Sequence, residues 1–199
     1  MQRFTLERRS KILRTVRDFF DALGFIEVET PVRIPAPAQE THIDAPPSGR
    51  AWLRASPELH MKRLLTEGFE KIYQIGPCFR SGECGRRHNP EFTMLEWYRT
   101  GADYLDILAD TEALVSAVFM ALFGKTTLSY RGATIQLAGP WTRLTVSDAY
   151  RRWAGWDPSQ HWDADRFDTD MIARIEPALP RATPCVLIDY RPPRLHSRG

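Results

Sequence analysis

Two β-rich runs, at residues 71–75 and 91–98, flank a strongly charged segment, and this arrangement constrains the fold more than any other feature of the chain. The runs read KIYQI and EFTMLEWY, rich in the β-branched and aromatic residues that strands favour. Joined by a long loop, they predict an antiparallel pair of neighbouring strands. Because successive strand residues point to opposite faces, one face of the second run is expected to carry Phe92, Met94, Glu96 and Tyr98.

Helical and strand patterns place further elements before this pair. Apolar residues recur three and four positions apart over 12–23 and are followed by Gly24, which predicts an amphipathic helix. The run FIEVETP then predicts a strand that stops at Pro31, because proline has no ladder donor. A second helix is predicted to begin with Ser56 as its N-cap and Pro57 at its first position.

The rest of the chain reads as one loop and several shorter elements. Residues 35–50 are rich in proline, glycine and serine and are expected to form a long loop, whereas the last ten residues fit no element. The other predicted elements are a helix over 104–123, a strand pair near 127–137, helices near 146–154 and 164–176, and a buried strand over 185–189. A chain of 199 residues with this composition is expected to form a single domain over residues 1–199.

Charge and cysteine usage limit the classes of function. Twenty-seven basic and 25 acidic side chains give a net charge of +2, so attraction to a polyanion must come from a local cluster, and residues 80–88 are the candidate. Three irregularly spaced cysteines, without a secretory leader or long apolar span, predict a cytoplasmic protein with no membrane partner. Cys78, Cys84 and His88 lack the paired spacing of a zinc site, so no metal site is predicted.

The basic loop and the strand after it suggest a nucleotide site. Arg80 can grip a phosphate or carboxylate with two parallel hydrogen bonds, and His88 with Arg86 or Arg87 can meet further phosphate oxygens. Two simpler interpretations stay open from the residues alone. Glu96 suits a structural ion pair with a nearby arginine, and the basic segment suits a solvated turn.

The stretch FR followed by RHNPEFTMLEWY resembles motif 2 of the class II aminoacyl-tRNA synthetases, in the lysyl branch, over residues 71–99. ASPELHMKRLL resembles the helix before that motif, and residues 8–33 resemble motif 1, whose proline ends a strand at a dimer interface. The resemblance is strong over about 8–105 and weak over 105–190. It implies a homodimer with the class II catalytic fold, an α+β fold whose antiparallel sheet is flanked by helices, here incomplete at the C-terminus.

The resemblance implies an ATP site with Mg²⁺ on the phosphates. Arg80 matches the catalytic arginine that bridges the α-phosphate and the amino-acid carboxylate, where negative charge develops. His88 matches a residue near the terminal phosphates, Asn89 its polar neighbour, and Phe92 the ring that stacks on adenine. The family's glutamate at the adenine amino group is replaced by glycine, and Glu83, one position later, is either its substitute or a surface acid.

Four further matches imply a site for lysine or β-lysine. Glu96 and Tyr98 match the pair that reads the side-chain ammonium, and Glu58 lies where the substrate amino group is held. A cationic substrate requires a charged acceptor, which a neutral amino acid would leave unpaired. In the similar family Ser56 sits beside the amino group and helps to favour β-lysine, a role compatible with its N-cap role.

Three functions stay open. The motif 1 helix starts within the first dozen residues, leaving no room before it for the anticodon-binding barrel of a lysyl-tRNA synthetase. The chain is therefore most similar to the family of short ligases that attach a lysine-type amino acid to a lysine of elongation factor P, with tRNA not expected as a partner. The alternatives are the catalytic core of a lysyl-tRNA synthetase and a non-catalytic paralogue that binds a ligand.

The C-terminal part departs from the family. Nothing after residue 105 resembles motif 3, whose arginine clamps the γ-phosphate, and CVLIDY is followed by the patternless RPPRLHSRG. The sequence therefore predicts a truncated chain with motif 3 absent and with reduced or no adenylation. An unpaired sheet edge is also expected to lower stability and favour self-association.

Overall fold

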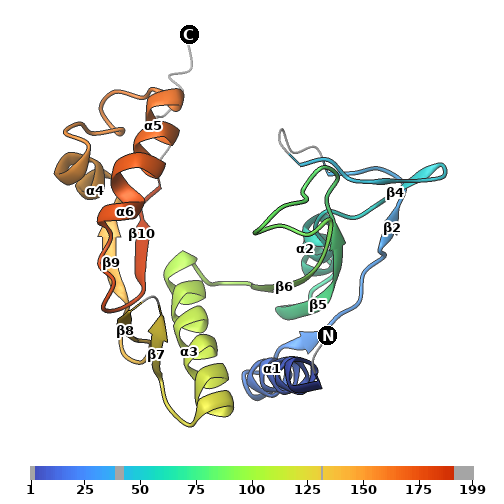
Figure 1. Cartoon of the computed structure of the whole chain (residues 1–199). Helices are drawn as coiled ribbons and strands as arrows, with labels where there is room; N and C mark the ends of the chain where they lie inside the picture. The colour runs from blue at the N-terminus through green and yellow to red at the C-terminus, as the bar shows by residue number, and fades with distance from the viewer. Residues whose placement is uncertain (1–2, 39–42, 131, 191–199) are drawn as a thin grey trace. The chain divides into compact units, whose positions relative to one another are not determined.

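A computed structural model describes residues 3–38, 43–130 and 132–190. The chain divides into two compact units, Met1–Ile107 and Leu108–Gly199. Figure 1 traces the elements of each unit along the chain. The single catalytic-type domain expected from the sequence stays a prediction. Within the described ranges, no helix is long and apolar enough to cross a membrane.

The first unit opens with the amphipathic helix that the sequence predicts. This helix, α1 (Arg3–Ala22), begins nine residues before Ile12, where the predicted stripe starts. Gly24 follows the helix with a φ of 75°, which glycine adopts readily. Phe20 is fully buried, and its ring stacks on Tyr73 with centroids 4.7 Å apart. It also meets Trp97, at 5.5 Å between centroids. The helix is therefore fixed to the sheet by aromatic packing.

The main sheet of this unit has the order β1-β5-β6. Strands β5 (Lys71–Phe79) and β6 (Glu91–Arg99) pair antiparallel along their whole length, which confirms the predicted pair. Strand β1 (Ile26–Glu27) runs parallel to β5 and is shorter than the run FIEVETP predicts. After β1 the Val28 N–H still donates to the Tyr73 carbonyl at 2.8 Å, whereas the Thr30 N–H donates to the side chain of Gln74 at 3.2 Å.

A small second sheet occupies part of the segment expected to be a loop. Its order is β2-β4-β3, with β2 (Arg33–Ile34) and β3 (Pro47–Ser48) each antiparallel to β4 (Ala51–Leu53). The prediction of a long loop over 35–50 is therefore wrong at Pro47–Ser48, which form β3. Gly49, at a φ of 64°, makes the turn from β3 into β4.

Arg54 joins the two sheets of the first unit. Its side chain is 1% exposed, and it donates from Nη1 to the carbonyl of Thr30 at 2.7 Å and from Nε to that of Pro77 at 3.0 Å. Gly76 provides the room for this guanidinium, because a Cβ at that position would lie 2.5 Å from Arg54 Nη2. A glycine at residue 76 is therefore needed for the buried Arg54 side chain to pack in this position.

Most predicted elements of the remaining chain are present. They are α3 (Tyr104–Phe123), the antiparallel pair β7 (Thr127–Tyr130) and β8 (Ala133–Gln136), α4 (Val146–Trp153), α5 (Ala164–Asp170), a π-helical turn (Met171–Ile175), α6 (Glu176–Ala178) and β10 (Cys185–Ile188). A short strand that the sequence did not reveal, β9 (Thr142–Thr145), pairs parallel with β10. The helix predicted near 164–176 is corrected to three pieces, and Pro177, which has no N–H to donate, is the second residue of the last of them.

The second unit has its own core. Tyr150 is fully buried, its ring stacks on Phe167 at 4.7 Å, and its hydroxyl donates to the Phe167 carbonyl at 2.7 Å. The other buried members of this cluster are Val146, Ala149, Ala154 and Ile175. Together the two units give the α+β composition expected from the sequence. The predicted lack of structure over the last ten residues falls almost entirely outside the described residues.

Candidate functional site

The carboxylate of Glu96 is held by two hydroxyl groups. Ser56 Oγ donates to Glu96 Oε2 at 3.1 Å, and the Tyr98 hydroxyl donates to Oε1 at 2.5 Å. Burial, and then this bond to the carboxylate, raise the pKa of the Tyr98 phenol well above its ordinary value, so the phenol keeps its proton and donates. The structure thus brings three predicted site residues together and fixes the orientation of the acid.

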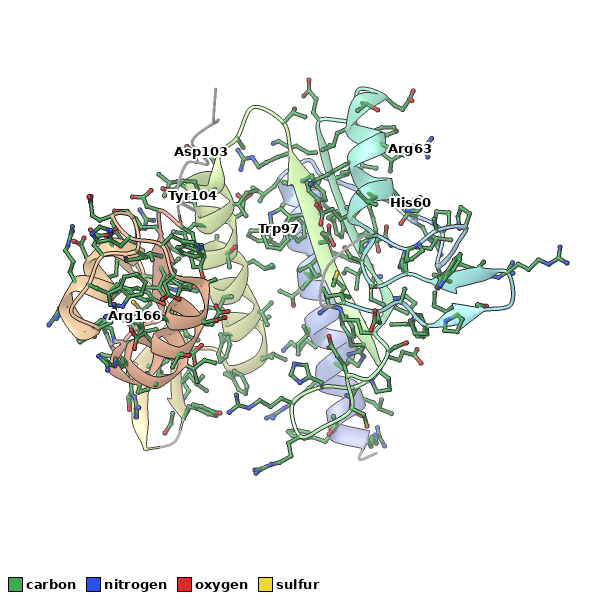
Figure 2. The ribbon with its side chains drawn as sticks, turned by 90° about the horizontal axis from the view of Figure 1, so that it is seen from above. His60, Arg63, Trp97, Asp103, Tyr104 and Arg166 are labelled. Carbon is green, nitrogen blue, oxygen red and sulfur yellow. The ribbon has the colours of Figure 1, made fainter. Side chains whose placement is uncertain are left out.

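Glu96 and Tyr98 lie on the same face of β6, as the alternation of side chains along a strand predicted. Helix α2 (Glu58–Thr66) packs beside β6, on the side where Ser56 reaches Glu96. Trp97, the residue between the two site residues of β6, instead contacts Phe20 of α1. Figure 2 shows Trp97 on β6, with His60 on the neighbouring α2. One face of the strand therefore serves the core and the other carries the polar constellation.

The start of α2 positions the fourth predicted substrate residue. The helix begins at Glu58, with Pro57 (φ −81°, ψ −4°) as the residue before it and not, as predicted, as the first helical residue. The N–H of Glu58 donates to Ser56 Oγ at 3.1 Å, which is the kind of hydrogen bond expected of an N-cap serine. Ser56 and Glu58 also line a cavity of about 240 Å³. Its other lining residues are Ile34, Ala36, Ala38, Ala55, Leu59 and His60.

A lysine that the sequence analysis did not single out joins this group. Lys62 Nζ lies 2.5 Å from Glu58 Oε1, one helical turn away, and 6.0 Å from the centre of the Tyr98 ring. The signal available in the sequence was a glutamate four residues before a lysine on a predicted helix. That spacing predicts the ion pair but not its approach to Tyr98, which depends on how α2 packs on β6.

Three of the predicted nucleotide-binding residues also come together. The guanidinium of Arg80 lies 5.1 Å from the centre of the Phe92 ring, and its Nη1 lies 3.6 Å from Glu83 Oε1. The backbone supports this arrangement, since the Arg80 N–H donates to the Pro90 carbonyl at 2.9 Å. A planar cation over an aromatic ring offers both a phosphate clamp and a stacking surface.

The other two predicted nucleotide-binding residues lie in the exposed loop. Gly85 N–H donates to the carbonyl of His88 at 3.0 Å, which closes a turn, and the side chains of His88, Asn89 and the two arginines before them are exposed. Among the described residues, no hydrogen bond or ion pair joins the side chain of His88 or Asn89 to Arg80. Their part in phosphate binding stays a prediction.

The residues considered as zinc ligands do not form a site. Within the described ranges, no three His, Cys, Asp or Glu side chains gather in a way that would hold a metal ion. Cys78 is buried, and burial raises the pKa of its thiol, whereas Cys84 is exposed. All three cysteines are free.

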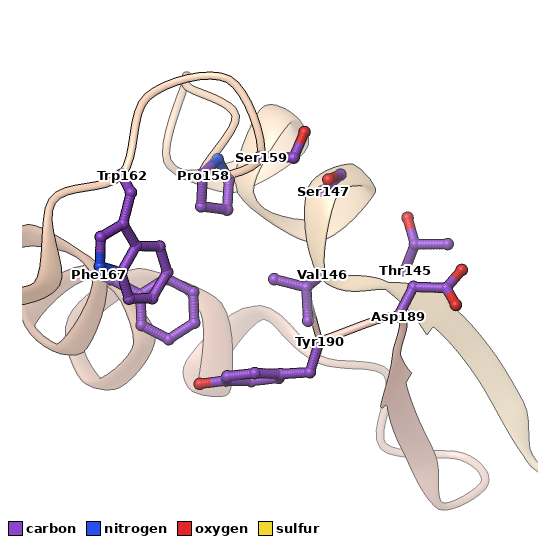
Figure 3. A pocket seen from close by; sticks show the side chains of 9 residues that line it. All are labelled: Thr145, Val146, Ser147, Pro158, Ser159, Trp162, Phe167, Asp189 and Tyr190. Carbon is purple, nitrogen blue, oxygen red and sulfur yellow. The ribbon is translucent and has the colours of Figure 1, made fainter. Parts of the chain in front are cut away.

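A separate cavity of about 220 Å³ lies in the second unit. Figure 3 shows Trp162, Pro158, Val146 and Tyr190 around it, with the Asp189 carboxylate directed away from the aromatic rings. Asp189 has a φ of 57°, uncommon for a residue with a side chain. None of the residues proposed from the sequence lines this cavity.

Comparison with known proteins identifies a family and relatives that match most of the chain. The family described as tRNA synthetases class II (D, K and N) matches residues 1–194. The lysine–tRNA ligases of Pelotomaculum thermopropionicum and Thiobacillus denitrificans are 46% and 43% identical over 157 residues, covering 76% of this chain and 31% of each ligase. A Clostridium botulinum lysine–tRNA ligase is 42% identical over 161 residues, covering 78% of this chain and 32% of the ligase. The chain spans about a third of the length of these curated relatives.

Proposed function

Because the chain belongs to the class II tRNA synthetases (D, K and N), we propose that it takes part in the ATP-dependent activation of a lysine-type amino acid. In that reaction the substrate carboxylate attacks the α-phosphorus of ATP, an aminoacyl-adenylate forms and pyrophosphate leaves. The observation that carries the proposal is Glu96, held between the hydroxyls of Ser56 and Tyr98. An oriented, half-buried carboxylate suits an ammonium group and penalises a neutral side chain.

The neighbouring residues suit the other parts of the substrates. Glu58 is proposed to hold the substrate amino group, and Arg80 to bridge its carboxylate and the α-phosphate, where a fixed cation stabilises developing negative charge. Phe92, under the Arg80 guanidinium, is proposed to stack on adenine, with Glu83 near its amino group. His88 and Asn89 are proposed at the terminal phosphates.

Magnesium is expected to enter with ATP, because hard cations bind phosphate oxygens and retain water. When bound, it would neutralise charge on the triphosphate. No cluster of three acidic or histidine ligands exists among the described residues, so we assign it no ligand in this chain. The residues of this chain position the substrate and supply the fixed charges.

The first prediction tests Glu96. Changing Glu96 to Gln is expected to weaken lysine binding by about 2 kcal/mol, or roughly thirtyfold, because a hydrogen bond between two charged groups is lost. Calorimetric titration with lysine measures the change. Glu91→Gln, at the exposed start of the same strand, is the matched control and should bind like the wild type. Unchanged lysine affinity in the Glu96 variant would remove the assignment.

For the acceptor we infer a lysine of elongation factor P, with tRNA charging as the second candidate. A net charge of +2 provides little overall attraction for a polyanion and so favours a protein acceptor mildly. The curated relatives are named lysine–tRNA ligases, which favours tRNA for them. Transfer of labelled lysine and β-lysine to elongation factor P, beside bulk tRNA, separates the candidates. Transfer to tRNA but not to elongation factor P would reject elongation factor P as the acceptor.

We also propose that the chain pairs as a homodimer through residues 8–33. This segment carries large apolar side chains at its surface, with Leu23 40% and Ile26 52% exposed. Exposed apolar groups on adjacent elements are typical of a protein interface. The partner proposed is a second copy of the same chain.

A further inference from the structure

Lys62 places an ammonium group of the chain itself beside Glu58, one of the acids of the proposed substrate site. Its Nζ is 2.5 Å from Glu58 Oε1 and 6.0 Å from the centre of the Tyr98 ring, and the Tyr98 hydroxyl in turn donates to Glu96. Glu58 is the acid proposed to hold the substrate amino group. The Glu58 carboxylate is thus paired with the amine of Lys62.

The ion pair between Lys62 and Glu58 is short, but both side chains are accessible to water and to an incoming ligand. The side chains of Lys62 and Glu58 are 53% and 42% exposed, so water screens the pair and substitutes readily for either partner. The hydrogen bond that Lys62 donates to Glu58 raises the pKa of Lys62, so the amine remains charged at neutral pH. A helical lysine also directs its side chain back toward the preceding turn, which keeps Nζ near Glu58.

A tethered amine has an advantage over a free one. Its carbon chain already confines it near Glu58, so no translational freedom is lost when the pair forms, and its effective concentration is high. An incoming lysine must release this amine before its own amino group can bind. If Lys62 stays nearby, two ammonium groups a few ångströms apart also repel each other.

We propose that Lys62 is a specificity-determining residue that competes with the substrate amino group for Glu58 and so lowers the affinity for free lysine. The inference rests on the proposed function, because it takes the assignment of Glu58 from it. Only ligands with an amino group beside the carboxylate meet this competition. A ligand that carries the distal ammonium alone does not.

Two ligands and three proteins test the competition by calorimetric titration. The ligands are lysine and 6-aminohexanoate, which keeps the carboxylate and distal ammonium but lacks the amino group beside the carboxylate. The proteins are the wild type, Lys62→Met, which keeps an aliphatic chain without charge, and Arg63→Met. The last removes one positive charge from the next position of α2 and is the matched control.

The expected result is a gain that is larger for lysine. Lys62→Met should bind lysine about three- to fivefold more tightly, from release of the helical ion pair and of repulsion between the amines. It should bind 6-aminohexanoate with a smaller gain, because the Lys62 charge also acts on Glu96. Arg63→Met should change neither ligand. Equal changes for both ligands, or weaker lysine binding in folded Lys62→Met, would overturn the inference while the proposed function stands. A wild type that binds neither ligand would overturn the proposed function and this inference with it.

Discussion

At the scale of single residues, Glu27 carries a pH-dependent part of the stability. Arg17 Nε donates to its carboxylate at 2.9 Å, and the Tyr73 hydroxyl donates at 3.1 Å. The hydrogen bond from Arg17 lowers the pKa of Glu27 below its ordinary value of 4.5. A depressed pKa in the folded state means that the carboxylate stabilises the fold above the unfolded value, and that this contribution is lost as the pH falls through the folded value.

Glu27→Gln is therefore expected to lower the free energy of unfolding at pH 7 and to leave it nearly unchanged near pH 3. The loss at pH 7 should be only about 0.5 kcal/mol, because both side chains of the pair are more than a third exposed and solvent screens them. Urea unfolding at several pH values measures the difference. The same loss at both pH values would show that packing, and not charge, is responsible.

Residue patterns predicted part of the candidate site. Alternation along β6 predicted that Glu96 and Tyr98 share a face, and the Ser-Pro-Glu start predicted the Ser56 bond to the Glu58 N–H, both of which the structure confirms. The bond from Ser56 to Glu96 spans 40 residues of chain and follows from packing that no local pattern contains. For the same reason, the place of Lys62 near Tyr98 was missed.

At the scale of elements, Gly76 governs how β5 accommodates Arg54. A Cβ at this position would lie 2.5 Å from Arg54 Nη2 and 3.4 Å from Gln74 Nε2. Gly76→Ala is therefore expected to destabilise the fold by about 1–3 kcal/mol, because the buried guanidinium must move away from its two carbonyl acceptors.

Thermal unfolding of Gly76→Ala beside Gly85→Ala measures this effect. Gly85 is the matched control, since a Cβ there would meet no atom within 4 Å and its φ is not positive. The control should stay within about 0.5 kcal/mol of the wild type. Equal stability of both variants would mean that Arg54 gives way without cost.

Periodic elements were predictable, and elements fixed by distant partners were not. Helices α1 and α3 could be predicted because their apolar residues recur three and four positions apart within one continuous stretch of chain. Strand β9 has four residues, TRLT, and exists because β10 pairs with it from about 40 residues away. Beyond the short strand β1, the Thr30 N–H donates to the side chain of Gln74, a contact across 44 residues that no local pattern shows.

At the scale of the whole molecule, the homodimer is the property to test. A double variant, Leu23→Gln with Ile26→Thr, replaces two exposed apolar side chains within residues 8–33 and should shift the chain toward monomer, because the interface loses apolar area. Light scattering at micromolar concentration measures the mass. Met120→Gln, 50% exposed but outside this segment, is the control and should keep the wild-type mass. A monomeric wild type would contradict the proposal.

The sequence did not indicate that the residues cluster into two compact units. Length and composition favoured one domain, since 199 residues suffice for a single core. The aromatic cluster around Phe20 and the cluster around Tyr150 each draw on residues of one unit only. Composition reports how much apolar surface a chain can bury but not how many cores share it.

The parallel pairing of β9 with β10 has a consequence for synthesis on the ribosome. Every strand of the β1-β5-β6 sheet precedes β9 in the chain, so that sheet has all its hydrogen-bonding partners before β9 is synthesised. Strand β9 cannot form its parallel pair until β10 has been synthesised, about 40 residues later. The helices between the two strands cannot pack against the completed pair before then. Because local pairings form before distant ones, the nascent chain would complete its polar constellation on β6 before it closes the core around Tyr150.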